Sequence, residues 1–262
     1  MAEAAFWGFV GASSLVIAAE LALRASISRM VVGLVMAFGV GTLISSIAFE
    51  LVEPAFETAG DVSFIVLGLL LGSVVFFLGD RAVSGLGAPR RKGTGPAHGR
   101  DSNGAPATTA TGGNEDGDEN GGLGIVLGTA LDGVPESVVL GMSIVSLGSV
   151  GPALLAAIWV SNLPESLGAS VALLRAGRSR RWVRTLWWSI VAMSAIAAAL
   201  GFWLITLTGP RLGAAVQAFA AGALLTMIAD EMAPQAFGRS ALYTGLATTA
   251  GFVVAFLLSS AE

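Results

Sequence analysis

Residues 130–142 read Ala-Leu-Asp-Gly-Val-Pro-Glu-Ser-Val-Val-Leu-Gly-Met and place two carboxylates and a proline inside an apolar segment. Asp132 and Glu136 are four residues apart, so on a helix both side chains project from the same face. Pro135 has no N–H group, so the carbonyl of Leu131 loses its helical hydrogen bond. The stretch therefore predicts a helix that carries buried charge and a locally opened backbone.

A related motif follows in the next apolar segment. Residues 161–166 read Ser-Asn-Leu-Pro-Glu-Ser, and Pro164 frees the carbonyl of Val160 in the same way. Two consecutive segments thus each hold a Pro-Glu-Ser sequence near their middle. The repetition predicts that the two segments contribute to one site.

Composition places these segments in a membrane. The chain is 54% hydrophobic and 12% charged, which is about half the charged fraction usual for a soluble domain. Apolar runs of roughly 17–25 residues are long enough to cross a bilayer as helices. We expect an all-α polytopic membrane protein with eight transmembrane helices near residues 6–23, 30–50, 63–79, 122–147, 152–174, 186–207, 213–232 and 241–259.

One segment differs from all the others. Residues 85–121 are rich in Gly, Pro, Thr, Asn and Asp, which predicts a disordered linker between transmembrane residues 1–84 and 122–262. Arginine and lysine concentrate on the side of the membrane that holds this linker, and Arg211 is alone on the other side. The positive-inside rule then makes the linker cytoplasmic and both termini extracytoplasmic, in a plasma membrane of the bacterial inner-membrane type.

The chain also repeats itself. Residues 41–51 resemble residues 222–232, and residues 72–78 resemble residues 251–257. Under the orientation above, the members of each pair cross the membrane in opposite directions, and the two Pro-Glu-Ser segments form the central pair. We predict a 3+2+3 inverted repeat, an arrangement that places the substrate of many secondary transporters on the central, interrupted helices.

The carboxylates within the predicted spans must be neutralised. Asp132, Glu136 and Glu165 would each cost about 2.5–3.5 kcal/mol in mid-membrane, and no Lys or Arg lies in the interior of a predicted span. Their charge must then be neutralised by protonation or by a bound cation. Because the chain has no cysteine, the candidate metal ligands are mainly oxygen donors, which suit hard or borderline divalent ions. These candidates are Asp132, Glu136, Ser161, Asn162 and Glu165.

Other residues receive simpler interpretations. Small residues are expected to let the two motif helices approach closely, namely Gly133, Gly141 and Gly168. Glutamates at the outer end of the second span are expected to be solvated, or else to form a vestibule that attracts cations: Glu50, Glu53 and Glu57. Acidic residues at the cytoplasmic end of the seventh span have solvation or cation exit as alternatives: Asp230 and Glu231.

These motifs resemble the ZIP family of divalent metal transporters. The resemblance rests on residues 132–136, 161–165 and 229–234, and it covers nearly the whole chain except the linker. It implies eight spans, extracytoplasmic termini and a long cytoplasmic loop between the third and fourth spans. It also implies inward transport of zinc, iron or manganese, with the metal as substrate and no cofactor.

The chain departs from the family pattern at several ligand positions. Asp132 stands where the family usually has His, Gly133 where it often has Asn, Ser161 where it usually has His or another polar ligand, and Asn162 where it often has Asp. Imidazole suits zinc, whereas carboxylate and water suit manganese or magnesium. The site implied by the resemblance is therefore a carboxylate site with an altered metal preference.

Alternatives remain open for the function. A degenerate family member would serve as a metal sensor or a structural membrane protein, and a proton-coupled carrier of another solute would use the carboxylates as a relay. An intramembrane enzyme is disfavoured, because no predicted span contains a histidine or a nucleophile–base pair.

The expected partners are a divalent cation and the lipid bilayer, with no nucleic acid, and an exposed glycine-rich face would permit a homodimer.

Overall fold

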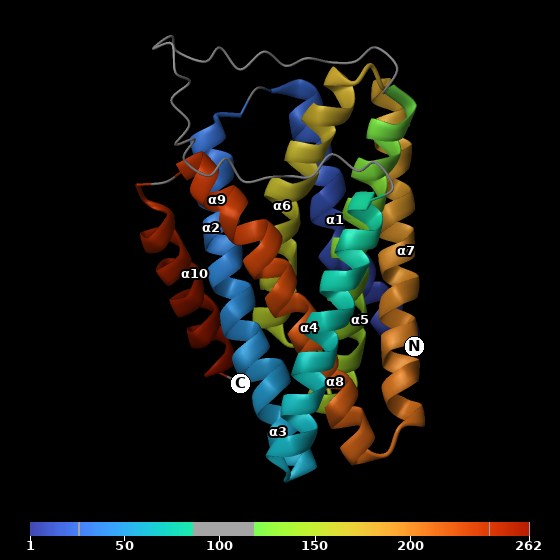
Figure 1. The fold of residues 1–262 in the computed structure, drawn as a ribbon, viewed down its shortest axis with the longest axis vertical. Coiled ribbons are helices and arrows are strands. Elements are labelled where there is room, and N and C mark those ends of the chain that lie inside the picture. The colour runs from blue at the N-terminus through green and yellow to red at the C-terminus, as the bar shows by residue number, and fades with distance from the viewer. Residues whose placement is uncertain (26, 86–117, 241, 262) are drawn as a thin grey trace, which may run out of the picture.

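The computed structural model is a bundle of helices that run roughly along its longest dimension (Figure 1). It describes residues 1–25, 27–85, 118–240 and 242–261, and within them the side chains outside residues 83–132. The secondary structure of this part of the chain contains helices and no strand, which confirms the all-α prediction for it. The predicted linker falls largely on residues 86–117, outside the described residues.

The helices follow the predicted apolar segments. Their bounds are α1 (Ala2–Arg24), α2 (Arg29–Ser46), η1 (Ile47–Val52), α3 (Glu53–Ala59), α4 (Val62–Gly85), α5 (Asp118–Leu147), α6 (Pro152–Arg175), α7 (Arg180–Leu207), α8 (Pro210–Met227), η2 (Ile228–Met232), α9 (Ala233–Ser240) and α10 (Thr244–Ser259). Five helical stretches among the described residues are long and apolar enough to cross a membrane: Ala2–Arg24, Arg29–Ala59, Val62–Ala82, Arg180–Leu207 and Pro210–Ser240. These stretches identify a membrane protein.

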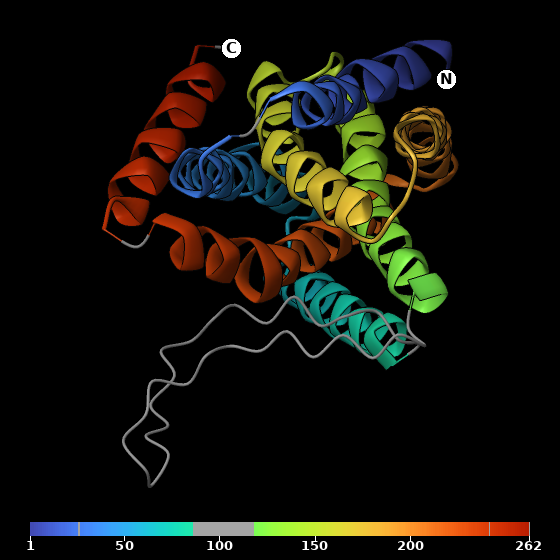
Figure 2. The same ribbon diagram turned by 90° about the horizontal axis from the view of Figure 1, so that it is seen from above.

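Helix α6 is central to the packing. It contacts α1 on one side, α2 on another and α5 as well. The remaining helices associate mainly in pairs, with α4 along α8, α10 along α2, and α7 along both α1 and α5. Seen from above, α4 and α10 lie at the edges of the bundle (Figure 2). Any site on α6 is therefore surrounded by protein.

Glycines allow direct backbone contact between α2 and α10. A Cβ atom on Gly41 would overlap the carbonyl oxygen of Thr248, and one on Gly251 would overlap that of Phe38. The two helices therefore approach until backbone touches backbone, a distance that only glycine permits.

The pair α4 and α8 repeats this arrangement. A Cβ atom on Gly222 would overlap the carbonyl oxygen of Leu69, and one on Gly72 would overlap that of Phe219. Gly41 and Gly222 begin one pair of similar segments, and Gly72 and Gly251 begin the other. The similarity in sequence thus corresponds to a similarity in helix packing.

Neither motif proline ends its helix. Pro135 lies inside α5 and Pro164 inside α6, so the expectation of broken helices is wrong. Proline in a membrane helix is tolerated where neighbouring helices and hydroxyl groups stabilise the backbone around it. The chain departs from α-helical geometry elsewhere, in the π-helical turns η1 and η2.

Each π-helical turn contains a glutamate and is followed by a proline. In η1 the glutamate is Glu50 and the proline is Pro54, whose missing N–H leaves the carbonyl of Glu50 without its usual helical donor. The side-chain amide of Gln217, on α8, lies 3.5 Å from this carbonyl oxygen. A side chain from another helix thus replaces the missing backbone donor.

The glycine contacts predict a difference between two substitutions in α10. We expect Gly251→Ala to lower thermal stability by the equivalent of about 1–3 kcal/mol, because the added methyl group overlaps backbone of α2. Gly245→Ala meets nothing within 4 Å and should leave stability unchanged or slightly raised. Melting curves of purified protein in detergent measure both, and equal effects would contradict the packing described.

Candidate functional site

The two predicted motifs meet at Ser161 and Glu136. The Ser161 hydroxyl lies 3.3 Å from Glu136 Oε1 on α5 and 3.0 Å from the carbonyl of Ile158 on its own helix. Ser161 and Glu136 are each 2% exposed. This contact joins α5 to α6 and places a carboxylate in the interior of the bundle.

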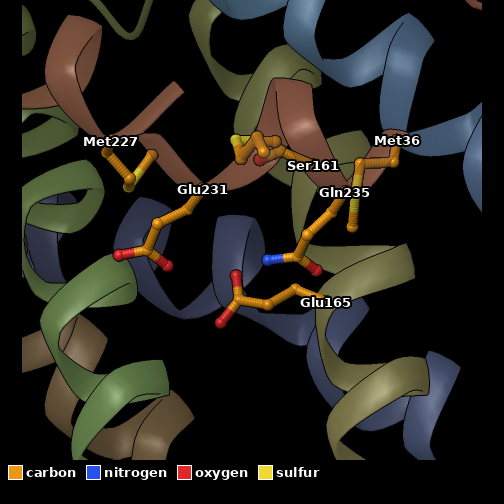
Figure 3. Close-up of a pocket in the computed structure, with 7 residues that line it drawn as sticks. Met36, Ser161, Glu165, Met227, Glu231 and Gln235 are labelled. Carbon is orange, nitrogen blue, oxygen red and sulfur yellow. The ribbon is translucent and has the colours of Figure 1, made fainter. Parts of the chain in front are cut away.

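A pocket opens beside Ser161 towards the η2–α9 segment. Its lining residues are Met36, Ser161, Glu165, Met227, Glu231, Met232 and Gln235. The carboxylates of Glu165 and Glu231 and the amide of Gln235 point into the same space (Figure 3). Glu231, which the sequence left open between solvation and cation exit, therefore belongs to the candidate site.

A cationic side chain also reaches this region. Arg239 on α9 directs its guanidinium to α6, with Nη2 3.4 Å from where a Cβ of Gly168 would lie, and its Nη1 is fully buried. The sequence placed Arg239 beyond the seventh span and did not indicate that its guanidinium reaches α6. The cause is the length of the arginine side chain, which carries its charge far from its Cα atom.

Asn162 lies on a different face of α6. Its Nδ2 donates a hydrogen bond to the carbonyl of Gly11 at 3.3 Å, and one turn later the Ser166 hydroxyl donates to the carbonyl of Leu15 at 2.8 Å. Both contacts attach α6 to α1. In this structure Asn162 therefore connects helices, and its role as a metal ligand stays a prediction.

The predicted ligands are only partly brought together. Ser161 links Glu136 to the pocket that contains Glu165, while the side chain of Asp132 lies outside the described residues. Among the described side chains, no group of three Asp, Glu or His residues is close enough to hold a metal ion. Oxygen donors of α6, η2 and α9 line the pocket, and Glu136 of α5 is joined to it through Ser161.

The motif glycines do not bring α5 and α6 together as expected. A Cβ atom on Gly141 would overlap the carbonyl oxygen of Ala198, so this glycine packs α5 on α7. Gly168 makes room for Arg239, and a Cβ atom on Gly133 would meet nothing within 4 Å. Helical periodicity gives the face of a glycine but not the partner that fills the space over it.

Glu50 is buried at the other end of α6. It is 2% exposed, and its Oε2 accepts a hydrogen bond of 3.2 Å from the backbone N–H of Leu154. Helix α6 has no capping side chain of its own at this end, so Glu50 supplies the acceptor that the free N–H groups and the helix dipole favour. The expectation of a solvated residue is wrong for Glu50, whereas Glu53 and Glu57 are exposed.

Comparison with protein families agrees with the resemblance in the motifs. The ZIP zinc transporter family matches residues 4–259. The chain belongs to this family. A comparison with curated proteins found no match. ZIP proteins are transporters and not enzymes, and they carry divalent metal cations, which makes the pocket between α6 and η2–α9 a candidate for a cation site.

The burial of Glu50 predicts a strong effect of its removal. We expect Glu50→Ala to destabilise this ZIP protein by about 1–3 kcal/mol, because the N-terminal turn of α6 loses a buried acceptor. Glu50→Gln retains an acceptor oxygen and should cost less. Thermal unfolding in detergent measures both, with Glu53→Ala as the control at an exposed neighbour. A Glu53→Ala protein as unstable as Glu50→Ala would contradict this assignment.

Proposed function

We propose that this ZIP protein moves a divalent metal cation, namely zinc, iron or manganese, into the cytoplasm through a carboxylate site on α5 and α6. The observation that carries the proposal is the buried contact between Ser161 and Glu136, continued by the pocket that Glu165 and Glu231 enter. Carboxylates in a membrane interior are costly, and a divalent cation compensates two of them at once.

The ligands divide into two groups in this proposal. Glu136 and Glu165 bind the metal directly, and Asp132 takes the place of the usual family histidine. Ser161 and Asn162 are auxiliary oxygen donors. Because no imidazole is present among these five residues, manganese gains relative to zinc.

The proposal includes the 3+2+3 inverted repeat of eight transmembrane helices. The matching glycine contacts of α2–α10 and α4–α8 support it, as do the π-helical turns at corresponding places in the two halves. Transport then follows alternating access, in which one group of helices moves against the other around the site. The charge distribution supports a plasma-membrane orientation with both termini outside.

A second candidate is a degenerate family member that does not transport metal and acts as a metal sensor or a structural membrane protein. It is favoured by one observation, that the described side chains contain no group of three potential metal-binding acids or histidines. Measurement of uptake separates the two candidates directly.

Loss of the core carboxylates should abolish transport. We expect saturable uptake of a divalent metal into proteoliposomes by the wild type, and none by Glu136→Ala or Glu165→Ala, because each variant removes a charge that binds the cation. Glu57→Ala, at an exposed residue of α3, is the control and should retain uptake. Wild-type uptake by both site variants would overturn the proposed site, and inactive but folded wild type would favour the second candidate.

The replacement of histidine by Asp132 should set the metal preference. We expect Asp132→His to raise uptake of zinc relative to manganese by about tenfold, since imidazole binds zinc better than a carboxylate does. Competition between labelled manganese and unlabelled zinc measures the ratio. An unchanged ratio would show that Asp132 is not a ligand.

A further inference from the structure

Two rows of side chains face each other between α6 and the η2–α9 segment. The row on η2–α9 has four-residue spacing: Glu231, Gln235 and Arg239. The row on α6 consists of Ser161, Glu165 and Gly168. The first two members of both rows line the pocket, and the third members contact each other. The guanidinium of Arg239 therefore lies in line with the two rows that border the pocket.

The fold makes room for the side chain of Arg239 on two helices. A Cβ atom on Gly168 would lie 3.4 Å from Arg239 Nη2, and one on Gly33 of α2 would lie 2.7 Å from Arg239 Cβ. Arg239 thus passes between α2 and α6, and its Nη1 is fully buried. Because arginine stays protonated in proteins, this side chain brings a permanent positive charge into the cleft.

The charge lies where negative charge is concentrated. Glu165 is three residues before Gly168 and therefore on the same side of α6. Glu231 lies on the segment that carries Arg239, and its carboxylate enters the pocket with that of Glu165 (Figure 3). An arginine whose guanidinium enters a membrane bundle is expected to interact with such carboxylates.

We propose that Arg239 is an internal cation of the transport cleft, which balances Glu165 and Glu231 when no metal is bound and competes with a divalent ion for them. This inference rests on the proposed function, because it concerns release of the ion from the same site. When a divalent cation binds both carboxylates, it balances their negative charge and leaves the charge of Arg239 uncompensated. The bound metal and the guanidinium then repel each other. Competition of this kind keeps binding weak enough for the ion to leave, as transport requires.

Binding measurements test the competition. Purified wild type, R239Q and R239K are titrated with Mn²⁺ alone, followed by electron paramagnetic resonance of the free ion, and with Zn²⁺ alone by equilibrium dialysis. We expect R239Q to bind at least one ion about tenfold more tightly, the order expected when one nearby charge is removed, and R239K to resemble wild type. Equal or weaker binding by R239Q for both ions would overturn the proposal.

A second measurement needs no metal. In EDTA, R239Q should melt below wild type, because Glu165 and Glu231 lose their balancing charge. Adding E165Q or E231Q to R239Q should restore the melting temperature, and a double variant that folds where R239Q does not would support the proposal equally. If neither double variant is more stable than R239Q, Arg239 only fills space and the proposal fails.

The two measurements also separate this inference from the proposed function. Wild type that binds neither ion would count against metal transport, and the melting temperatures in EDTA would then still decide whether Arg239 balances the carboxylates. Wild type that binds metal, with R239Q no tighter, would leave transport standing and reject Arg239 as a competitor.

Discussion

A carboxylate held out of water must be matched by hydrogen-bond donors or by positive charge, and this constraint explains most of the polar structure of the protein. Glu50 meets it with the N-terminal turn of α6, and Glu136 has the hydroxyl of Ser161 beside it. Glu165 and Glu231 share a pocket, and the guanidinium of Arg239 lies beside Gly168 on the same helix as Glu165. The groups that match these carboxylates lie on different helices, so the acidic residues determine which helices must be neighbours.

Helix α6 carries most of these connections. Its first turn accepts Glu50 as a cap, and a second face is attached to α1 through Asn162 and Ser166. A third face presents Ser161 and Glu165 to the pocket. The indole of Trp187 on α7 adds a hydrogen bond of 2.8 Å to Ser170 near the other end of the helix. A helix fixed at so many points can hold ligands in a defined position, which ion binding requires.

The sequence predicted well the features that depend on local pattern. Apolar runs indicated the helices, because this signal lies within short stretches. The sequence was less informative where a side chain meets a distant helix. Nothing near Glu50 indicates that the N-terminus of α6 lies against it, and nothing near Arg239 indicates that Gly168 leaves space for it. Burial of a charged residue depends on partners that are remote in sequence, so its local context is a poor guide.

The continuity of α6 through Pro164 has a mechanical consequence. Leu154, which Glu50 holds, and Glu165, which enters the pocket, are eleven residues apart on one unbroken helix. At the rise of an α-helix this separation is about 16 Å. Because α6 is continuous, a tilt that separates its first turn from Glu50 must also displace Glu165. The contact at Glu50 and the pocket at Glu165 are therefore coupled through one continuous helix.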